Sequence, residues 1–216
     1  MDEGFIATTF ETTTTAITFN DVVISNPTTS ALNSVYSIDF VPEADIPENG
    51  ILIIEVPRTL EMTPDNVRSS GSCVGTVECI EVVAADPNDP NSMGYIKIRV
   101  KDRIIADRPF TFDLGGVRNP RNTAPSTNFI INSFDESAGV SAQIGKGTGA
   151  NIEMSELAPI EKFSGTTDGT RNGSINKYTF SITSQIALED GDKLTFDLPD
   201  QIKPPESSLL LDCQEV

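Results

Sequence analysis

The chain has 216 residues, with 15 Lys and Arg against 32 Asp and Glu and no histidine, which gives a formal net charge of −17 at pH 7. A surface this acidic repels phosphate backbones, which argues against nucleic-acid binding, and no apolar run has the length of a membrane-spanning helix. The absence of histidine excludes Ser-His-Asp and Cys-His catalysis and histidine metal sites. The length allows one large domain, or one domain and part of another.

Apolar and polar residues alternate with a period of two along most of the chain, as in half-buried β-strands. The clearest strand-like segments are, in order, residues 36–40, 52–56, 96–101, 110–114 and 129–131. Turn-forming residues separate them, at residues 47–50, 86–91 and 172–174. No long stretch has helical spacing, and residues 152–158 have room for only one short turn. The pattern predicts an all-β fold of antiparallel sheets packed face to face as a sandwich.

An internal repeat is predicted by two segments that align without a gap. Residues 36–57 match residues 178–199 over 22 positions, with Tyr36 on Tyr178 and apolar residues on apolar residues in both strand-like parts. A slip of one residue would move every apolar side chain to the other face of its strand. The agreement therefore predicts tandem copies of one β-sandwich.

The repeat sets the predicted domain boundaries. Residues 11–148 are expected to form one complete β-sandwich repeat, and residues 149–216 the truncated first half of the next. Residues 1–6 resemble residues 134–140, and residues 1–10 are therefore interpreted as the last strand of a preceding repeat, or as a linker. Because the amino terminus lacks a basic region followed by an apolar core, it is not a secretory signal, and we interpret the chain as an interior segment of a longer protein.

The chain contains three cysteines, Cys73, Cys79 and Cys213. The first two are separated by five residues around Gly75, a spacing that suits a small disulfide loop between neighbouring strands. The alternative is a pair of free, buried thiols. Cys213 falls near the place of Cys73 in the repeat, so its disulfide partner is expected beyond Val216. Metal ligation by these cysteines is disfavoured, because there is neither a histidine nor a second cysteine pair to complete four ligands.

The run from Tyr36 to Phe40, the run from Ile46 to Pro57 and the cysteine pair that follows resemble repeats in very large secreted or cell-surface proteins of protists, ciliates especially. Similar repeats occur in prokaryotic surface proteins. The resemblance implies immunoglobulin-like modules of surface coats and filaments, hence an extracellular or cell-surface location, and it supplies no functional residues. The buried tryptophan typical of antibody domains is absent, since the chain has no tryptophan.

Two further kinds of site are candidates. Asp86, Asn88, Asp89 and Asn91 crowd one loop whose oxygen atoms could ligate Ca²⁺, although Asp and Asn are also ordinary turn residues. Calcium is the one cofactor for which the sequence offers ligands.

Glycosylation is the other candidate chemistry. Asn172 heads the sequon Asn-Gly-Ser in a predicted loop. Thr12, Thr13, Thr14 and Thr15 belong to a threonine-rich run that suits either O-glycosylation or the exposed face of a linker strand.

These observations predict a structural subunit of an extracellular filament or coat built from tandem β-sandwich repeats, whose partners are copies of itself or neighbouring repeats. The alternative is a cell-surface adhesin module that binds a glycan or a protein ligand, with or without calcium. No catalytic motif is present, and among 32 acidic residues carboxylate pairs arise by chance, so we do not expect an enzyme.

Overall fold

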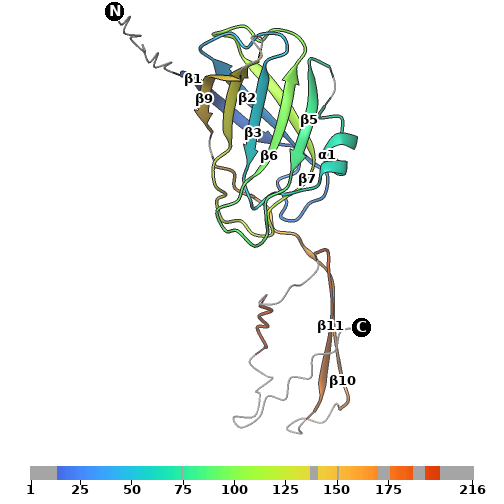
Figure 1. The fold of residues 1–216 in the computed structure, drawn as a ribbon. Coiled ribbons are helices and arrows are strands. Elements are labelled where there is room, and N and C mark those ends of the chain that lie inside the picture. The colour runs from blue at the N-terminus through green and yellow to red at the C-terminus, as the bar shows by residue number, and fades with distance from the viewer. Residues whose placement is uncertain are drawn as a thin grey trace, which may run out of the picture. The chain divides into compact units, whose positions relative to one another are not determined.

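The computed structural model describes residues 14–73, 75–136, 141–149, 151–169, 176–186 and 193–199. The chain divides between Pro159 and Ile160 into two compact units, called unit 1 and unit 2. The expectation of an all-β protein is confirmed: apart from one short helix, all regular structure in the described residues consists of β-strands (Figure 1).

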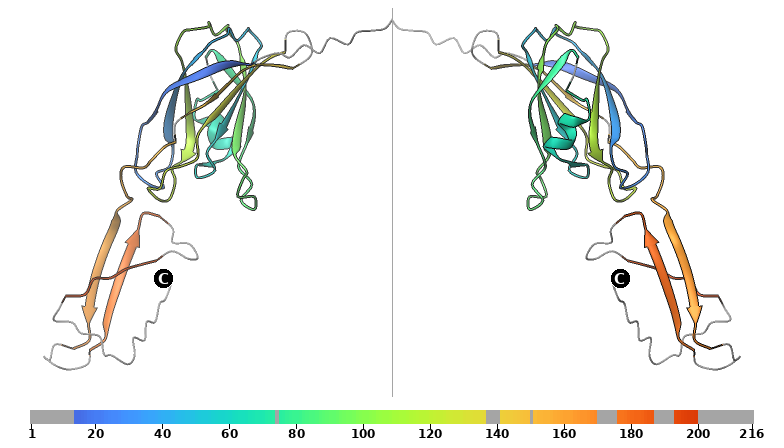
Figure 2. Two further views of the ribbon diagram at one scale, coloured as in Figure 1. Left: turned by 90° about the vertical axis from the view of Figure 1, so that its left-hand side faces the viewer. Right: turned by 90° about the vertical axis from the view of Figure 1, so that its right-hand side faces the viewer.

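Unit 1 is built on a sheet of nine strands. In chain order its elements are β1 (Thr15–Ile24), β2 (Ser34–Pro42), β3 (Ile51–Val56), β4 (Glu61–Met62), α1 (Pro64–Ser69), β5 (Val77–Val83), β6 (Gly94–Val100), β7 (Phe110–Arg118), β8 (Ile130–Asp135) and β9 (Ala142–Thr148). The hydrogen-bonded order across the sheet is β4-β7-β2-β1-β9-β8-β3-β6-β5. The sheet curls around one hydrophobic core, so that its shape is that of a nearly closed barrel (Figures 1 and 2).

The alternation in the sequence predicts correctly which side chains enter this core. In β2, Tyr36, Ile38 and Phe40 are fully buried, and the residues between them are only partly so. In β3, Leu52 and Ile54 are fully buried as well. β3 pairs with β6 on one side and with β8 on the other, which makes it an interior strand of the sheet.

The prediction of an antiparallel, immunoglobulin-like sandwich is wrong for unit 1, because the sheet is mixed. Thr15 and Ala16 at the start of β1 pair in parallel with β9, while the rest of β1 pairs with β2. The approach to β9 is close: a Cβ atom at Gly147 would lie 2.2 Å from the backbone oxygen of Ile17. The absence of a side chain at Gly147 therefore lets β1 lie against β9. This contact joins the strands from β4 to β1 and the strands from β9 to β5 into one sheet.

Helix α1 fills the gap between the two ends of the sheet. It packs against β7, next to the edge strand β4, and against β5, the other edge strand. Val67 points into the core and is fully buried. Gly116 in β7 has a φ of +71°, and a Cβ atom there would lie 2.2 Å from the backbone oxygen of Asn66. Glycine is thus required for the helix to lie against the sheet. The sequence did not reveal this helix, since its six residues are too few for a helical period.

Unit 2 contains a single hairpin in its described part, made of β10 (Ile160–Thr167) and β11 (Tyr178–Ser184). Both strands are visible in the two views of Figure 2. Residues 193–199 are described and belong to neither strand. The described residues therefore form one barrel-like sheet and one hairpin, and the prediction of two tandem sandwiches is wrong for them.

Candidate functional site

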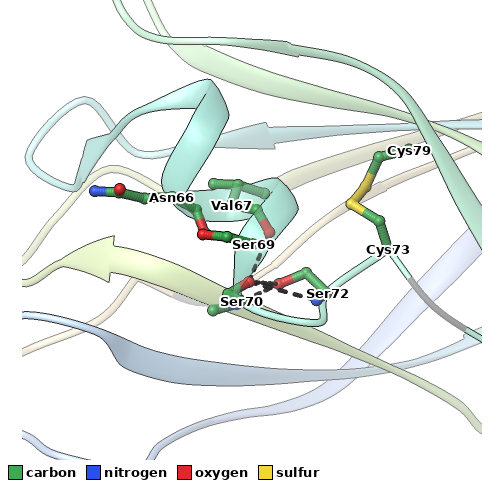
Figure 3. Close-up of a disulfide and its surroundings, with 8 residues drawn as sticks. Asn66, Val67, Ser69, Ser70, Ser72, Cys73 and Cys79 are labelled. Atoms are coloured by element: carbon green, nitrogen blue, oxygen red, sulfur yellow. Dashed lines mark hydrogen bonds between the residues drawn. A yellow bond between two sulfur atoms is a disulfide. The ribbon is translucent and has the colours of Figure 1, made fainter.

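A disulfide joins Cys73, which follows α1, to Cys79 in β5 (Figure 3). The two Cα atoms are 5.0 Å apart, and both residues are half-buried. The bond fastens the segment after α1 to the edge strand, at the place where the helix bridges the two ends of the sheet. Cys213, the third cysteine, lies outside the described residues, as does any partner of it.

A short chain of hydroxyl groups fixes the same segment to β7. The backbone N–H of Gly115 donates to Ser72 Oγ at 2.7 Å, and Ser70 Oγ donates to the backbone oxygen of Val67 at 2.6 Å. The two hydroxyl oxygens are 2.6 Å apart. Since the hydrogen of Ser70 is directed to Val67, Ser72 is the donor between them (Figure 3). Together with the disulfide, these bonds hold the segment after α1 against β5 and β7, which is a structural role.

The predicted calcium loop is exposed, and its carboxylates serve the backbone. Asp86 Oδ1 accepts the backbone N–H of Asn88 at 2.8 Å, and Asp89 Oδ1 accepts that of Asn91 at 2.9 Å. These are the hydrogen bonds by which Asp stabilises turns. Among the described residues no group of three or more His, Cys, Asp or Glu side chains is placed to hold a metal ion.

The structure places only part of the candidate glycosylation sites. Asn172, Thr12 and Thr13 lie outside the described residues. Thr14 is exposed. Thr15 is the first residue of β1, and its hydroxyl donates to the backbone oxygen of Ile144 at 3.0 Å, so this side chain takes part in holding β1 to β9. Residues 1–10, interpreted above as a strand or linker, are not described either.

A buried polar network that the sequence analysis missed links β2 to the end of β7. The hydroxyl of Tyr36 donates to Asn119 Oδ1 at 2.6 Å, and Asn119 Nδ2 donates to the backbone oxygens of Asn26 and Thr28 at 2.6 and 2.7 Å. Tyr36 and Asn119 are both fully buried. Burial raises the pKa of Tyr36 well above its usual value. The only signal in the sequence was a tyrosine at an inward-facing strand position, where its hydroxyl needs a partner.

A second tyrosine is perturbed at the surface of the sheet. The pKa of Tyr95 in β6 is raised, first by its side-chain hydrogen bond to Glu81, then by loss of solvent and by the negative charge of Glu81. This pair lies on the exposed face of β5 and β6 and, like the ion pair between Arg99 and Glu78, joins neighbouring strands. We see no catalytic arrangement in either pair.

Unit 2 presents the largest exposed aromatic group in the described chain. The rings of Phe163 and Phe180 are stacked with centroids 5.8 Å apart, and Phe196 lies 6.1 and 5.6 Å from them. Their exposed fractions are 58, 38 and 43%, respectively. We call this surface the aromatic face. The exposed large apolar residues in the described part of unit 2 are Ile160, Phe163, Tyr178, Phe180, Leu194, Phe196 and Leu198.

No family model matches the chain, and no curated protein sequence matches it. The described residues contain no helix of the length and apolar character needed to cross a membrane.

Proposed function

We propose that the chain is a structural module of an extracellular or cell-surface filament or coat, in which β domains of the unit 1 kind follow one another. The observation that carries this proposal is the hairpin of unit 2. It has seven residue pairs, as β1 and β2 have. The first strand of each hairpin also contains one bulged residue, at Asn20 after the third pair in β1 and at Glu161 after the first pair in β10. The ends also correspond, since Ile24 lies opposite Tyr36 and Thr167 opposite Tyr178. This agreement includes strands outside the aligned segments of sequence.

Charge and covalent chemistry support the setting. A net charge of −17 favours a soluble surface and suits a medium rich in cations. The disulfide in unit 1 is of the kind that persists in oxidising compartments. A domain with its own hydrophobic core, fastened by a disulfide, suits the role of a spacer in a semi-rigid array.

Electron microscopy of the native, full-length material, with and without EDTA, tests this function. Filaments or coats with an axial repeat of one or two domain lengths are the expected result. Loss of the filaments in EDTA would show that the assembly needs a divalent cation, for which the loop of residues 86–91 is the candidate site. Dispersed particles under both conditions would contradict the structural role and leave the adhesin module, which is then tested by ligand binding to the monomer.

A further inference from the structure

We infer that the aromatic face of unit 2 is one half of a second hydrophobic core, and that its partner is a set of antiparallel strands like β6, β7 and β8, joined in that order after residues 193–199. This inference rests on the repeat in the proposed function and adds the surface, the register and the chemistry of what covers it. The partner strands belong to the same polypeptide, as they do in unit 1.

The pairing in the two hairpins identifies equivalent residues. In unit 1, Phe19 lies opposite Phe40, and Val22 lies opposite Ile38. In unit 2, Phe163 lies opposite Ile182, and Gly165 lies opposite Phe180. If the pair that contains the tyrosine is counted as the first, Phe19 and Phe163 each belong to the fifth pair of their hairpin. Phe163 is therefore the counterpart of Phe19. A residue that points into a core in unit 1 is thus matched by a residue of the aromatic face.

The two members of each matched pair differ in how far their side chains are buried. Tyr36 and Ile38 are fully buried, whereas their counterparts Tyr178 and Phe180 are 41 and 38% exposed. Ile54 is fully buried, and its counterpart Phe196 is 43% exposed. Side chains of this size lose favourable free energy when they remain in water, and contiguous exposed apolar patches mark binding surfaces. A two-stranded hairpin is also only marginally stable by itself.

Unit 1 shows which strands supply the cover. β7 pairs with the free side of β2, and β6 and β8 pair with the two sides of β3. In unit 2, β11 takes the place of β2, and residues 193–199 carry the apolar residues of β3. Among the described residues of unit 2, no strand pairs with the outer side of β11 or with residues 193–199. The unfilled positions are those of β6, β7 and β8.

A graft designed from the repeat tests this inference. In the extended chain, residues 1–199 are followed by a second copy of residues 58–148, because Pro199 matches Pro57. A Phe163→Trp substitution gives a single fluorescent reporter, since the chain has no tryptophan. The expected result is a shift of its emission to shorter wavelength and a several-fold loss of acrylamide quenching, relative to the same substitution in the 216-residue chain.

A matched control distinguishes specific packing from non-specific cover. In unit 1, Ile98 is fully buried and lies opposite Leu52, so its copy is expected opposite Leu194. The graft whose copied strand carries Ile98→Asp should leave the reporter exposed. Protection that is equal in both grafts would overturn the inference. So would a concentration-dependent loss of quenching in the 216-residue chain, which would show that a second copy covers the face.

A second chain guards against a graft that does not fold. It carries residues 160–184 in place of residues 17–42 of unit 1, so that β7 must close on β11 instead of β2. Slow amide exchange in the transplanted strands would support the inference, and rapid exchange in both engineered chains would overturn it. Neither measurement depends on filaments: a protected face in a protein that forms none would contradict the proposed function alone.

Discussion

Replacing Asn119 by alanine is expected to be among the most damaging single changes in unit 1. The side chain makes three hydrogen bonds inside the protein, one with the hydroxyl of Tyr36 and two with the backbone oxygens of Asn26 and Thr28. At about 1 kcal/mol for each bond, Asn119→Ala should lower the free energy of unfolding by about 3 kcal/mol. The buried hydroxyl of Tyr36 is then left without its partner, which raises the cost further.

A double-mutant cycle isolates the bond between the two side chains. Tyr36→Phe alone removes one hydrogen bond and leaves Asn119 Oδ1 unpaired, at a cost of about 1.5 kcal/mol. Once the hydroxyl is absent, Asn119→Ala no longer strands it. The two substitutions together should therefore cost about 1–2 kcal/mol less than the sum of the single costs.

Urea denaturation at neutral pH, followed by far-ultraviolet circular dichroism, measures these free energies. Asn122→Ala is a suitable control, because Asn122 is exposed and its Oδ1 accepts a local hydrogen bond from the backbone N–H of Ala124, and a change below about 0.5 kcal/mol is expected. Costs for Tyr36 and Asn119 that add within about 0.5 kcal/mol would refute the reasoning, since they would show that the two side chains do not interact.

Three further changes test other parts of unit 1. Replacing both Cys73 and Cys79 by serine should lower the free energy of unfolding by about 2 kcal/mol, the value for a loop closed over a sequence separation of six residues, and adding reductant to the wild-type chain should reproduce the loss in urea titrations. Gly116→Ala should lower the free energy of unfolding by about 3 kcal/mol, since the new Cβ atom meets the backbone of α1. Gly75→Ala, at a φ of +80° and with open space around it, should lower it by only about 1 kcal/mol. Equal costs would contradict the close packing of α1 on Gly116. Burial raises the pKa of Tyr36 above its unfolded value of about 10, so its contribution to stability is complete below pH 10 and falls by about 1.4 kcal/mol per pH unit above it. The free energy of unfolding, measured from about pH 9 to 11.5, should therefore decrease less steeply with pH in Tyr36→Phe than in the wild-type chain.

Local sequence patterns predicted the strands well. The alternation in β2 and β6 identifies which side chains are buried, because successive residues of a strand point to opposite faces. The spacing of Cys73 and Cys79 led to a disulfide prediction at the place where the structure has the bond. The turn at residues 86–91 was also foreseen, while its role as a calcium site stays a prediction.

Patterns of this kind do not reveal contacts between distant segments. The partner of Tyr36 is 83 residues away, and nothing in the alternation points to Asn119. Helix α1 is too short to show a period. The sequence alone does not show which side chains of β10 share a face of the sheet with those of β11. The pairing of the two strands shows it, because it places Phe163 beside Phe180.

The sequence by itself determined that this is a β protein, because a period of two in hydrophobicity is a local property of the chain. Only the tertiary structure decided how the strands join. The parallel contact of β1 with β9 depends on glycines that bring two backbones together, and a missing side chain carries no periodic signal. The closure by α1 depends likewise on Gly116, whose importance becomes visible only when the helix lies against it. The exposure of the aromatic face is a tertiary property too, since the same alternation describes a buried strand in unit 1 and an uncovered one in unit 2.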